Sequence, residues 1–269
     1  MDWTTNPCCG AVPRPESWRP FFKSDAGRLR HAAHNLALAL VNAMALALLF
    51  GVATVVVADW AETNRVGLLH TLELPWAARL LLAIVLLDAW MYVWHRANHV
   101  VPWLWRFHRM HHSDTRMDVT TATRFHLGEH AGGALLRLGL VPLAGFEAWQ
   151  LIAYDTLVVA VTMLHHANVS LGRADRWLRW LIVTPFIHKV HHSRAPHETN
   201  SNYATVLSIW DRLAWTFRLR ADPATIDFGL DGFDDPHWQT FAGMWQTPLR
   251  AEPTPADEPA LARSEREWP

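Results

Sequence analysis

Histidine stands out in this sequence of 269 residues, because 17 are present and eight of them fall into three short clusters. The first cluster is HRANH, and the other two, HRMHH and HKVHH, share an H-x-x-H-H pattern. Residues three or four positions apart lie on the same face of a helix, so each cluster would project its imidazoles in one direction. The clustered histidines are His95, His99, His108, His111, His112, His188, His191 and His192.

An imidazole face of this kind suits iron, zinc, copper or nickel, and the ligand type alone does not choose among them. Eight histidines exceed what one metal ion can coordinate, so two adjacent metal ions are the simplest explanation. Soluble di-iron bundles use mainly glutamate with Glu-x-x-His, whereas the residues available here are nearly all nitrogen donors. The sequence therefore predicts a di-metal site of a different class, with open positions for oxygen or substrate.

Two further histidines are candidate ligands. His166 ends the last apolar segment and would return to the surface that carries the clusters, and His126 follows the second cluster in RFHLGE. The remaining histidines are expected to have ordinary packing or surface roles, and one of them, His70, falls in a loop predicted on the opposite side. They are His31, His34, His70, His130, His165, His197 and His237.

Three carboxylates could support the ligands from behind by accepting a hydrogen bond from a ring N–H. Asp88 lies about two helical turns before His95, and Asp155 lies near three turns before His166. Both could equally pair with an arginine or lie at the membrane interface, and Glu129 could cap a helix or pair instead.

Composition points to a membrane. Charged residues make up 18% of the chain and hydrophobic residues 51%, whereas soluble domains contain roughly 25% charged residues. Two apolar runs, 36–58 and 76–94, are long enough to span the hydrocarbon core, which takes roughly 20 helical residues. A third apolar region, 131–164, is broken by Pro142 and Gly145 and predicts a helix out and a helix back, or a re-entrant hairpin. The fold class expected is an all-α membrane bundle of about four helices, with a helical cap that carries the histidines.

Charge around the first span predicts the orientation. Lys23, Arg28 and Arg30 precede this span, whereas the loop 59–75 carries Glu62 and Glu73 against Arg65 alone. By the positive-inside rule the N-terminus is cytoplasmic. Two crossings and a returning hairpin then place every histidine cluster on the cytoplasmic side.

Domain boundaries follow from these segments. We expect a cytoplasmic N-terminal segment over 1–34, a membrane-embedded catalytic domain over 35–248 with its histidine core at about 88–216, and a disordered tail over 249–269, which is polar and proline-rich. Arginine and tryptophan alternate with aliphatic residues over 172–185, as in a helix lying in the headgroup plane. The two cysteines, Cys8 and Cys9, are adjacent and can form neither a disulfide framework nor a thiolate metal site. The net charge of −1 gives no basic field for nucleic acid.

Taken in order, the motifs resemble the fatty acid hydroxylase and sterol desaturase superfamily. The segments that carry the resemblance run from about Asp88 to Thr216 and are DAWMYVWHRANH, WRFHRMHHS, RFHLGE, HHANV, TPFIHKVHHS and NYATVLSIWDRLAWTF. His166 and Asn168 match the family's H-x-N element, in which Asn168 is expected to support the ligand. Leu127 stands where the family's R-x-H-P-x-E element has proline, and Ala204 and Trp215 stand where glycines are common.

The resemblance implies a membrane di-iron enzyme that uses O2 and external electrons to hydroxylate or desaturate an unactivated C–H bond of a lipid, such as a sterol or fatty acyl lipid. It implies that the eight clustered histidines and His166 are iron ligands. Because no dinucleotide-binding motif is recognisable, we expect a separate electron donor, a ferredoxin or a cytochrome b5-like protein. Its docking surface, or a contact with lipid phosphate, could involve Arg106, Arg109, Lys189 and Arg194.

Two other functions are compatible with clustered histidines. A membrane zinc hydrolase would activate water without redox chemistry. A metal transporter would place histidines along the spans rather than beyond their ends. The zinc hydrolase predicts activity without oxygen. The transporter fits less well, because the histidines here cluster beyond the ends of the spans.

Overall fold

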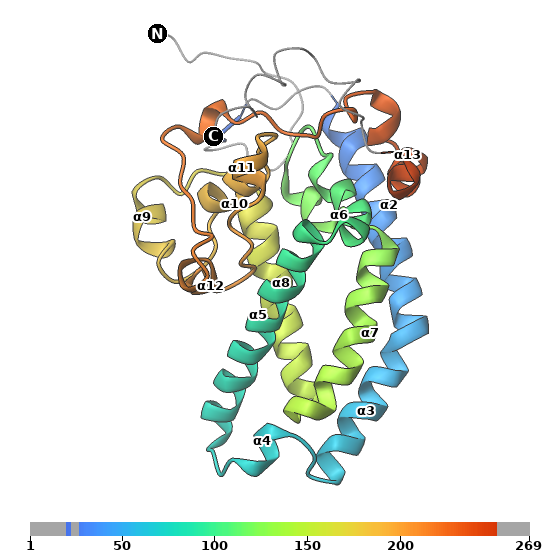
Figure 1. Ribbon diagram of the computed structural model, residues 1–269, viewed down its shortest axis with the longest axis vertical. Coiled ribbons are helices and arrows are strands. Elements are labelled where there is room, and N and C mark those ends of the chain that lie inside the picture. Colours follow the sequence, from blue (N-terminus) through green and yellow to red (C-terminus); the bar gives the residue numbers. More distant parts are fainter. Residues whose placement is uncertain (1–19, 23–26, 252–269) are drawn as a thin grey trace, which may run out of the picture.

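The computed structural model describes residues 20–22 and 27–251, and these residues form helices and no β-strand. Long helices run side by side over most of the molecule, and shorter helices gather at one end (Figure 1). The α-helices are α2 (Arg28–Leu46), α3 (Val52–Thr63), α4 (Leu68–Thr71), α5 (Trp76–Val100), α6 (Pro102–His112), α7 (Leu127–Ala144), α8 (Ala148–His166), α9 (Asp175–Leu178), α10 (Pro185–His191), α11 (Pro196–Thr199), α12 (Ile209–Leu213) and α13 (Phe241–Gln246). The predicted all-α class is confirmed.

Three helical stretches are long and apolar enough to cross a membrane: Arg28–Thr71, Trp76–Val100 and Ala148–His166. The fourth predicted helix is α7, which runs beside them (Figure 1). Large apolar side chains on the first stretch face outward, since Leu48 is 83% exposed and Val52 is 73% exposed. Soluble proteins rarely leave such stripes uncovered, so these features indicate an integral membrane protein.

The first helix begins earlier than the apolar run predicts. It starts at Arg28 and continues through a π-helical turn, Ala47–Gly51, into α3. Its first turns are polar but pack inside the molecule, because His31 and Asn35 are buried there. Residues 28–34, assigned to the N-terminal segment by sequence, are therefore the start of this helix. Cys8, Cys9 and Lys23 lie outside the described residues, as does the tail beyond residue 251.

Gly145 makes the predicted hairpin between α7 and α8. Its φ of 78° is left-handed and ends α7, a conformation that costs glycine little. A Cβ at Gly67 would lie 2.2 Å from the Gly145 backbone nitrogen, so the loop before α4 packs directly on this turn. Pro142 does not break the helix but lies inside its last turn. The two halves are therefore a full helix out and a full helix back.

The segment 172–185 is not the single interfacial helix that its sequence suggests. It contains a 3-10 turn, Gly172–Ala174, and the single turn of α9, followed by irregular chain. Trp177 and Trp180 remain 76% and 67% exposed. The apolar residues thus stay on the surface without a long helix to carry them.

The histidine-bearing elements meet at one end of the bundle. His95 and His99 lie in the last turns of α5, and His166 is the last residue of α8. The two H-x-x-H-H motifs lie on short helices, α6 and α10, that begin with Pro102 and Pro185. Proline at the first helical position lacks only an N–H that would be unpaired there anyway. The cap at this end therefore collects residues that are up to 97 positions apart (His95 to His192).

Candidate metal centre

Nine histidines converge in two groups. The first, the five-histidine group, has one ligand atom from each member within 4.8 Å of the others and consists of His95, His99, His108, His112 and His191. The second, the four-histidine group, meets the same limit and consists of His111, His166, His188 and His192. These are the eight clustered histidines and His166, which the sequence singled out. Both groups could hold a metal ion.

The two H-x-x-H-H motifs divide between the groups in opposite ways. On α6, the pair four residues apart, His108 and His112, goes to the five-histidine group, and His111 goes to the other. On α10, the pair four residues apart, His188 and His192, goes to the four-histidine group, and His191 crosses over. Each short helix therefore contributes to both groups and ties them together.

Hydrogen bonds fix the tautomer of several rings. The Nδ1–H groups of His95 and His191 donate to the carbonyl oxygens of Tyr203 (2.7 Å) and Ser201 (2.6 Å). A carbonyl oxygen can only accept, so these rings carry their proton on Nδ1 and present a bare lone pair on Nε2. The two Nε2 atoms nevertheless lie 3.1 Å apart. Neither ring has a proton left for a hydrogen bond between them, and facing lone pairs are favourable only where a cation lies beside both.

The four-histidine group repeats this arrangement at His166. Its Nδ1–H donates to the Thr162 carbonyl oxygen at 2.8 Å, so its Nε2 is also a lone pair. That atom lies 3.1 Å from Nε2 of His111 and 3.0 Å from Nε2 of His188. Burial lowers the pKa of His188 and His111 well below the usual value, so these rings are neutral. Neutral, buried nitrogen donors pointing at one another are what a divalent transition metal requires.

Among the carboxylates, Glu129 lies directly behind a histidine of the groups. Its Oε1 accepts a hydrogen bond from Nδ1 of His108 at 2.9 Å, and the side chain is buried on α7. Such a carboxylate fixes the ring orientation and raises the basicity of the other nitrogen. This contact supports the role that the sequence suggested for Glu129.

Asp88 acts elsewhere than expected. It is fully buried, and its two oxygens accept hydrogen bonds from the Tyr154 hydroxyl, the Trp210 indole and the backbone nitrogens of Val206 and Leu207, at 2.8–3.2 Å. None of these donors is a histidine. Asp88 instead anchors the segment just after Tyr203, whose carbonyl orients His95, so its effect on the metal groups is indirect.

Two other predicted site residues also lie apart from this arrangement. Asp155 forms an ion pair with Arg137 at 2.8 Å and is 53% exposed, which is the alternative that the sequence left open. His126 belongs to neither histidine group. It precedes α7, its Nδ1 accepts the Gly128 N–H, and its ring packs on Phe107 and Trp245. The RFHLGE segment therefore contains the start of α7.

Asn168 holds the N-terminal segment against the cap. Its Oδ1 accepts hydrogen bonds from the backbone nitrogens of Phe21 and Phe22, and its Nδ2 donates to the Phe22 carbonyl. These contacts lie two residues after His166 in the chain. Asn168 thus supports the region around a histidine of the four-histidine group through the backbone.

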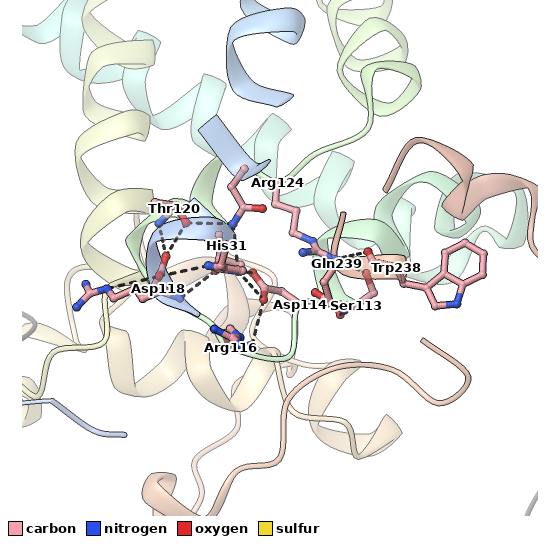
Figure 2. Close-up of polar contacts among 12 residues, drawn as sticks. His31, Ser113, Asp114, Arg116, Asp118, Thr120, Arg124, Trp238 and Gln239 are labelled. Carbon is pink, nitrogen blue, oxygen red and sulfur yellow. Dashed lines mark hydrogen bonds and ion pairs between the residues drawn. The ribbon is translucent and has the colours of Figure 1, made fainter. Parts of the chain in front are cut away.

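A buried polar network stabilises the chain just after the second cluster (Figure 2). Asp114 accepts from Nε2 of His31 at 2.9 Å and from the Thr121 hydroxyl at 2.8 Å, and Arg124 donates to the Met110 carbonyl and the Ser113 hydroxyl. Burial alone would raise the pKa of Asp114, but Arg124 and His31 hold it well below its usual range. The network joins the start of α2 to the end of α6 and so fixes where His111 and His112 point.

The cations proposed as a docking surface are mostly not available for one. Lys189 is fully buried and donates to the Ala167 carbonyl at 2.7 Å, and burial lowers its pKa to about 7. Arg109 is buried and donates to the carbonyls of Thr247 and Arg250. Arg194 is paired with acidic residues, including Asp234 at 2.5 Å. The prediction of a four-residue basic surface is wrong for Lys189 and Arg109, because both satisfy carbonyls inside the cap; Arg106 is exposed.

An apolar cavity of about 370 Å³ opens onto both histidine groups. His95 and His108 from one group and His111, His166 and His188 from the other line it, together with apolar residues of α2, α5 and α8. The volume lies in the range of small-ligand pockets. A hydrocarbon held there would be next to both candidate metal positions and shielded from water.

Two histidines treated as ordinary by the sequence analysis also line this cavity. His165 is 1% exposed, neither of its ring nitrogens has a hydrogen-bond partner among the described residues, and its ring stacks on His188 at 3.8 Å. His130 directly follows Glu129 in the first turn of α7 and packs on Phe125. The doublet HH at 165–166 was the available signal, since two adjacent histidines at the end of a span both reach the cap.

Comparison with known proteins agrees with this geometry. The family model described as "Fatty acid hydroxylase" matches residues 80–216, about half of the chain, and the chain belongs to that family. The resemblance noted in the sequence is confirmed. No solved structure matches the chain.

Curated relatives cover the same region. The chain is 32% identical over 160 residues to ornithine lipid hydroxylase OlsE of Rhizobium tropici, which covers 59% of this chain and 47% of the relative. It is 31% identical over 155 residues to alkylglycerol monooxygenase of Danio rerio, covering 57% and 34%. It is 25% identical over 153 residues to cholesterol 25-hydroxylase of Homo sapiens, covering 54% and 53%. The matches thus span about half or less of these relatives.

Proposed function

We propose that this protein is an O2-dependent membrane oxygenase that hydroxylates an unactivated C–H bond of a lipid, with desaturation as the other outcome of the same chemistry. The observation that carries the proposal is the pair of Nε2 lone pairs of His95 and His191, held 3.1 Å apart by carbonyl acceptors behind both rings. That arrangement suits a metal ion, and the second group lies beside the first. The family membership supports oxygenation over hydrolysis.

Two iron ions are the proposed cofactor. The five-histidine group would hold one ion and the four-histidine group the other, with His126 outside both sets. Bound iron would supply the redox chemistry that activates O2. The protein's own contribution is to orient the ligand rings through Glu129 and the Tyr203 and Ser201 carbonyls, and to keep water away from the bound hydrocarbon.

A lipid is the proposed substrate class. The cavity is lined largely by apolar residues of the long helices α2, α5 and α8, next to the histidines of the cap. The names of the relatives mention an ornithine lipid, an alkylglycerol and cholesterol, which share an apolar body rather than a headgroup. We propose that the substrate enters from the bilayer between the long helices.

Two parts of the proposal concern the surroundings of the site. The positive-inside pattern supports a cytoplasmic position for the metal groups. The redox chemistry requires electrons, which we propose come from a separate ferredoxin or cytochrome b5-like protein.

The test is expression in a lipid-containing host under oxygen-18 gas, followed by mass spectrometry of the extracted lipids. A lipid that gains one oxygen-18 atom with the wild-type protein, and not with His108→Ala, supports hydroxylation; a loss of two hydrogens without oxygen-18 identifies desaturation. Products that appear equally under nitrogen would contradict the oxygenase and favour a zinc hydrolase. Identical lipids from both strains would also contradict it.

A further inference from the structure

A charged pair lies where the membrane helices would be expected to carry none. Arg137 on α7 and Asp155 on α8 are ion-paired at 2.8 Å, and both line a groove of about 670 Å³ between the long helices. Among the residues that line this groove, Arg137 is the only lysine or arginine and Asp155 the only carboxylate. Ionisable groups at this depth are costly and are usually retained for a function.

The ion pair leaves most of the guanidinium without a partner. Only Nη1 of Arg137 contacts Asp155, at 2.8 Å and 3.1 Å from its two oxygens. Nε and Nη2 are both buried and have no hydrogen-bond partner among the described residues. These two nitrogens form the edge of the guanidinium that binds a carboxylate or phosphate through two parallel hydrogen bonds. A structural ion pair that only joined α7 to α8 would gain by using this edge, and here neither nitrogen of the edge forms a hydrogen bond within the described part of the chain.

The groove leads to the metal groups. Six residues line both the groove and the cavity beside the histidines, so the two spaces adjoin. They are Leu46, Met91, Trp94, His130, Val158 and Val159. His130 and Arg137 are seven residues apart on α7, which is about 10 Å along the axis. A long, narrow molecule could therefore reach from Arg137 to the cavity.

We propose that Arg137 binds the anionic end of the substrate, a carboxylate or a phosphate on an apolar chain, while the chain extends through the groove to the metal groups. This inference rests on the proposed lipid oxygenase function. Asp155 holds the guanidinium in the groove through its contact with Nη1. The distance between the anionic end and the cavity then sets which carbon lies at the metals.

Binding can be measured without turnover, because Trp90 and Trp94 line the groove and bromine quenches tryptophan fluorescence at short range. The metal-loaded full-length protein, in nanodiscs of zwitterionic lipid, is titrated with dibromostearic acid, its methyl ester, and lysophosphatidic acid with the same brominated chain. We expect the wild type to bind the acid or the phosphate at least about tenfold more tightly than the uncharged ester, as charge-assisted bonds allow. The arm that binds more tightly identifies the anionic group.

Variants separate recognition from structure. Arg137→Gln should bring anion binding down to the level of the ester, and Arg137→Lys should be intermediate because lysine keeps the charge but lacks the two-nitrogen edge. Asp155→Asn should bind the anion more tightly, since a competing negative charge is removed. Arg176→Gln, which removes an exposed cation on α9, is the matched control and should match the wild type. Metal content reports that each variant is folded.

Equal binding of acid, phosphate and ester by the wild type would overturn the inference, as would anion binding by Arg137→Gln that equals the wild type. Once a product is known, Arg137→Gln should also spread the oxidised position over neighbouring carbons, which loss of a purely structural ion pair would not do. The binding result stands apart from the oxygen-18 result. If the wild type binds the anion but incorporates no oxygen-18 into lipid, the proposed function is rejected. If the wild type incorporates oxygen-18 but shows no preference for the anion, the role of Arg137 is rejected.

Discussion

The two histidine groups differ in how firmly their rings are held. In the five-histidine group, the ring nitrogens of His95, His108 and His191 that face away from the centre bond to Tyr203, Glu129 and Ser201. The other two rings of that group, His99 and His112, have no partner on either nitrogen among the described residues. In the four-histidine group, the bond from His166 to the Thr162 carbonyl holds one ring in this way, and Nδ1 of His111 and His188 has no partner among the described residues. Preoriented ligands bind metal more tightly. The four-histidine group should therefore bind its metal ion more weakly than the five-histidine group.

The largest expected effect comes from removing one ligand of each group. We expect His95→Ala and His188→Ala each to lose at least about one hundredfold in activity, because each removes a ligand ring from its group. Metal analysis should show that His188→Ala keeps metal in the five-histidine group, whereas His95→Ala loses it there. Full metal occupancy in either variant would contradict the division into two groups.

Metal removal tests the inequality directly. With increasing chelator, the wild type should lose one metal equivalent first and the second only at higher chelator concentration. The metal that remains should be the one that His95→Ala lacks. Simultaneous loss of both equivalents would mean that the groups do not differ in affinity.

Glu129→Gln should weaken the five-histidine group selectively. A carboxylate behind a metal-bound histidine typically contributes about 10-fold to 100-fold in metal affinity. The glutamine side chain can still accept a hydrogen bond from Nδ1–H of His108, but it lacks the negative charge of the carboxylate. In this variant, we expect the second metal ion to be lost at a lower chelator concentration, closer to that which removes the first. If both metal ions are lost at the wild-type chelator concentrations, the supporting role of Glu129 is excluded.

Asp88→Asn should act on the same group from farther away. An amide offers one acceptor oxygen, so two of the four donors that Asp88 satisfies would face an NH2 group, at a cost of roughly 1–3 kcal/mol for each orphaned donor. The segment after Tyr203 would loosen, and thermal unfolding should shift to lower temperature with a modest loss of metal from the five-histidine group. Conversion to leucine is a useful second variant, because it removes the acceptors altogether and should be worse.

His126→Ala should have the smallest effect, since this ring contacts neither group. Loss of its bond to the Gly128 N–H at the start of α7 should cost roughly 1 kcal/mol of stability. Metal content should equal that of the wild type in both groups. A loss of one metal equivalent in this variant would mean that His126 is a ligand and that one of the two groups has a further member.

The residues that could form the metal centre were predictable from the sequence. The spacing in H-x-x-H-H places three imidazoles on one helix face whatever surrounds the helix, and the apolar runs and the hairpin at Gly145 bring the histidine-bearing ends of α5 and α8 to one side of the bundle. Local rules of this kind act within one helix, so they could be read without knowing its neighbours. The nine histidines that converge were all identifiable in this way.

How these residues divide between the two groups, and which side chains lie behind them, could be seen only in the folded structure. Helical spacing placed Asp88 on the face of His95, but its hydrogen-bond donors are Tyr154, Val206, Leu207 and Trp210, which lie 66–122 residues away in the chain. The same limit applies to Asp155, which meets Arg137, and to Lys189, whose ammonium is buried against a carbonyl. Whether a charged side chain supports a ligand, pairs or binds a substrate depends on the elements packed against it, and periodicity along one helix carries no information about those.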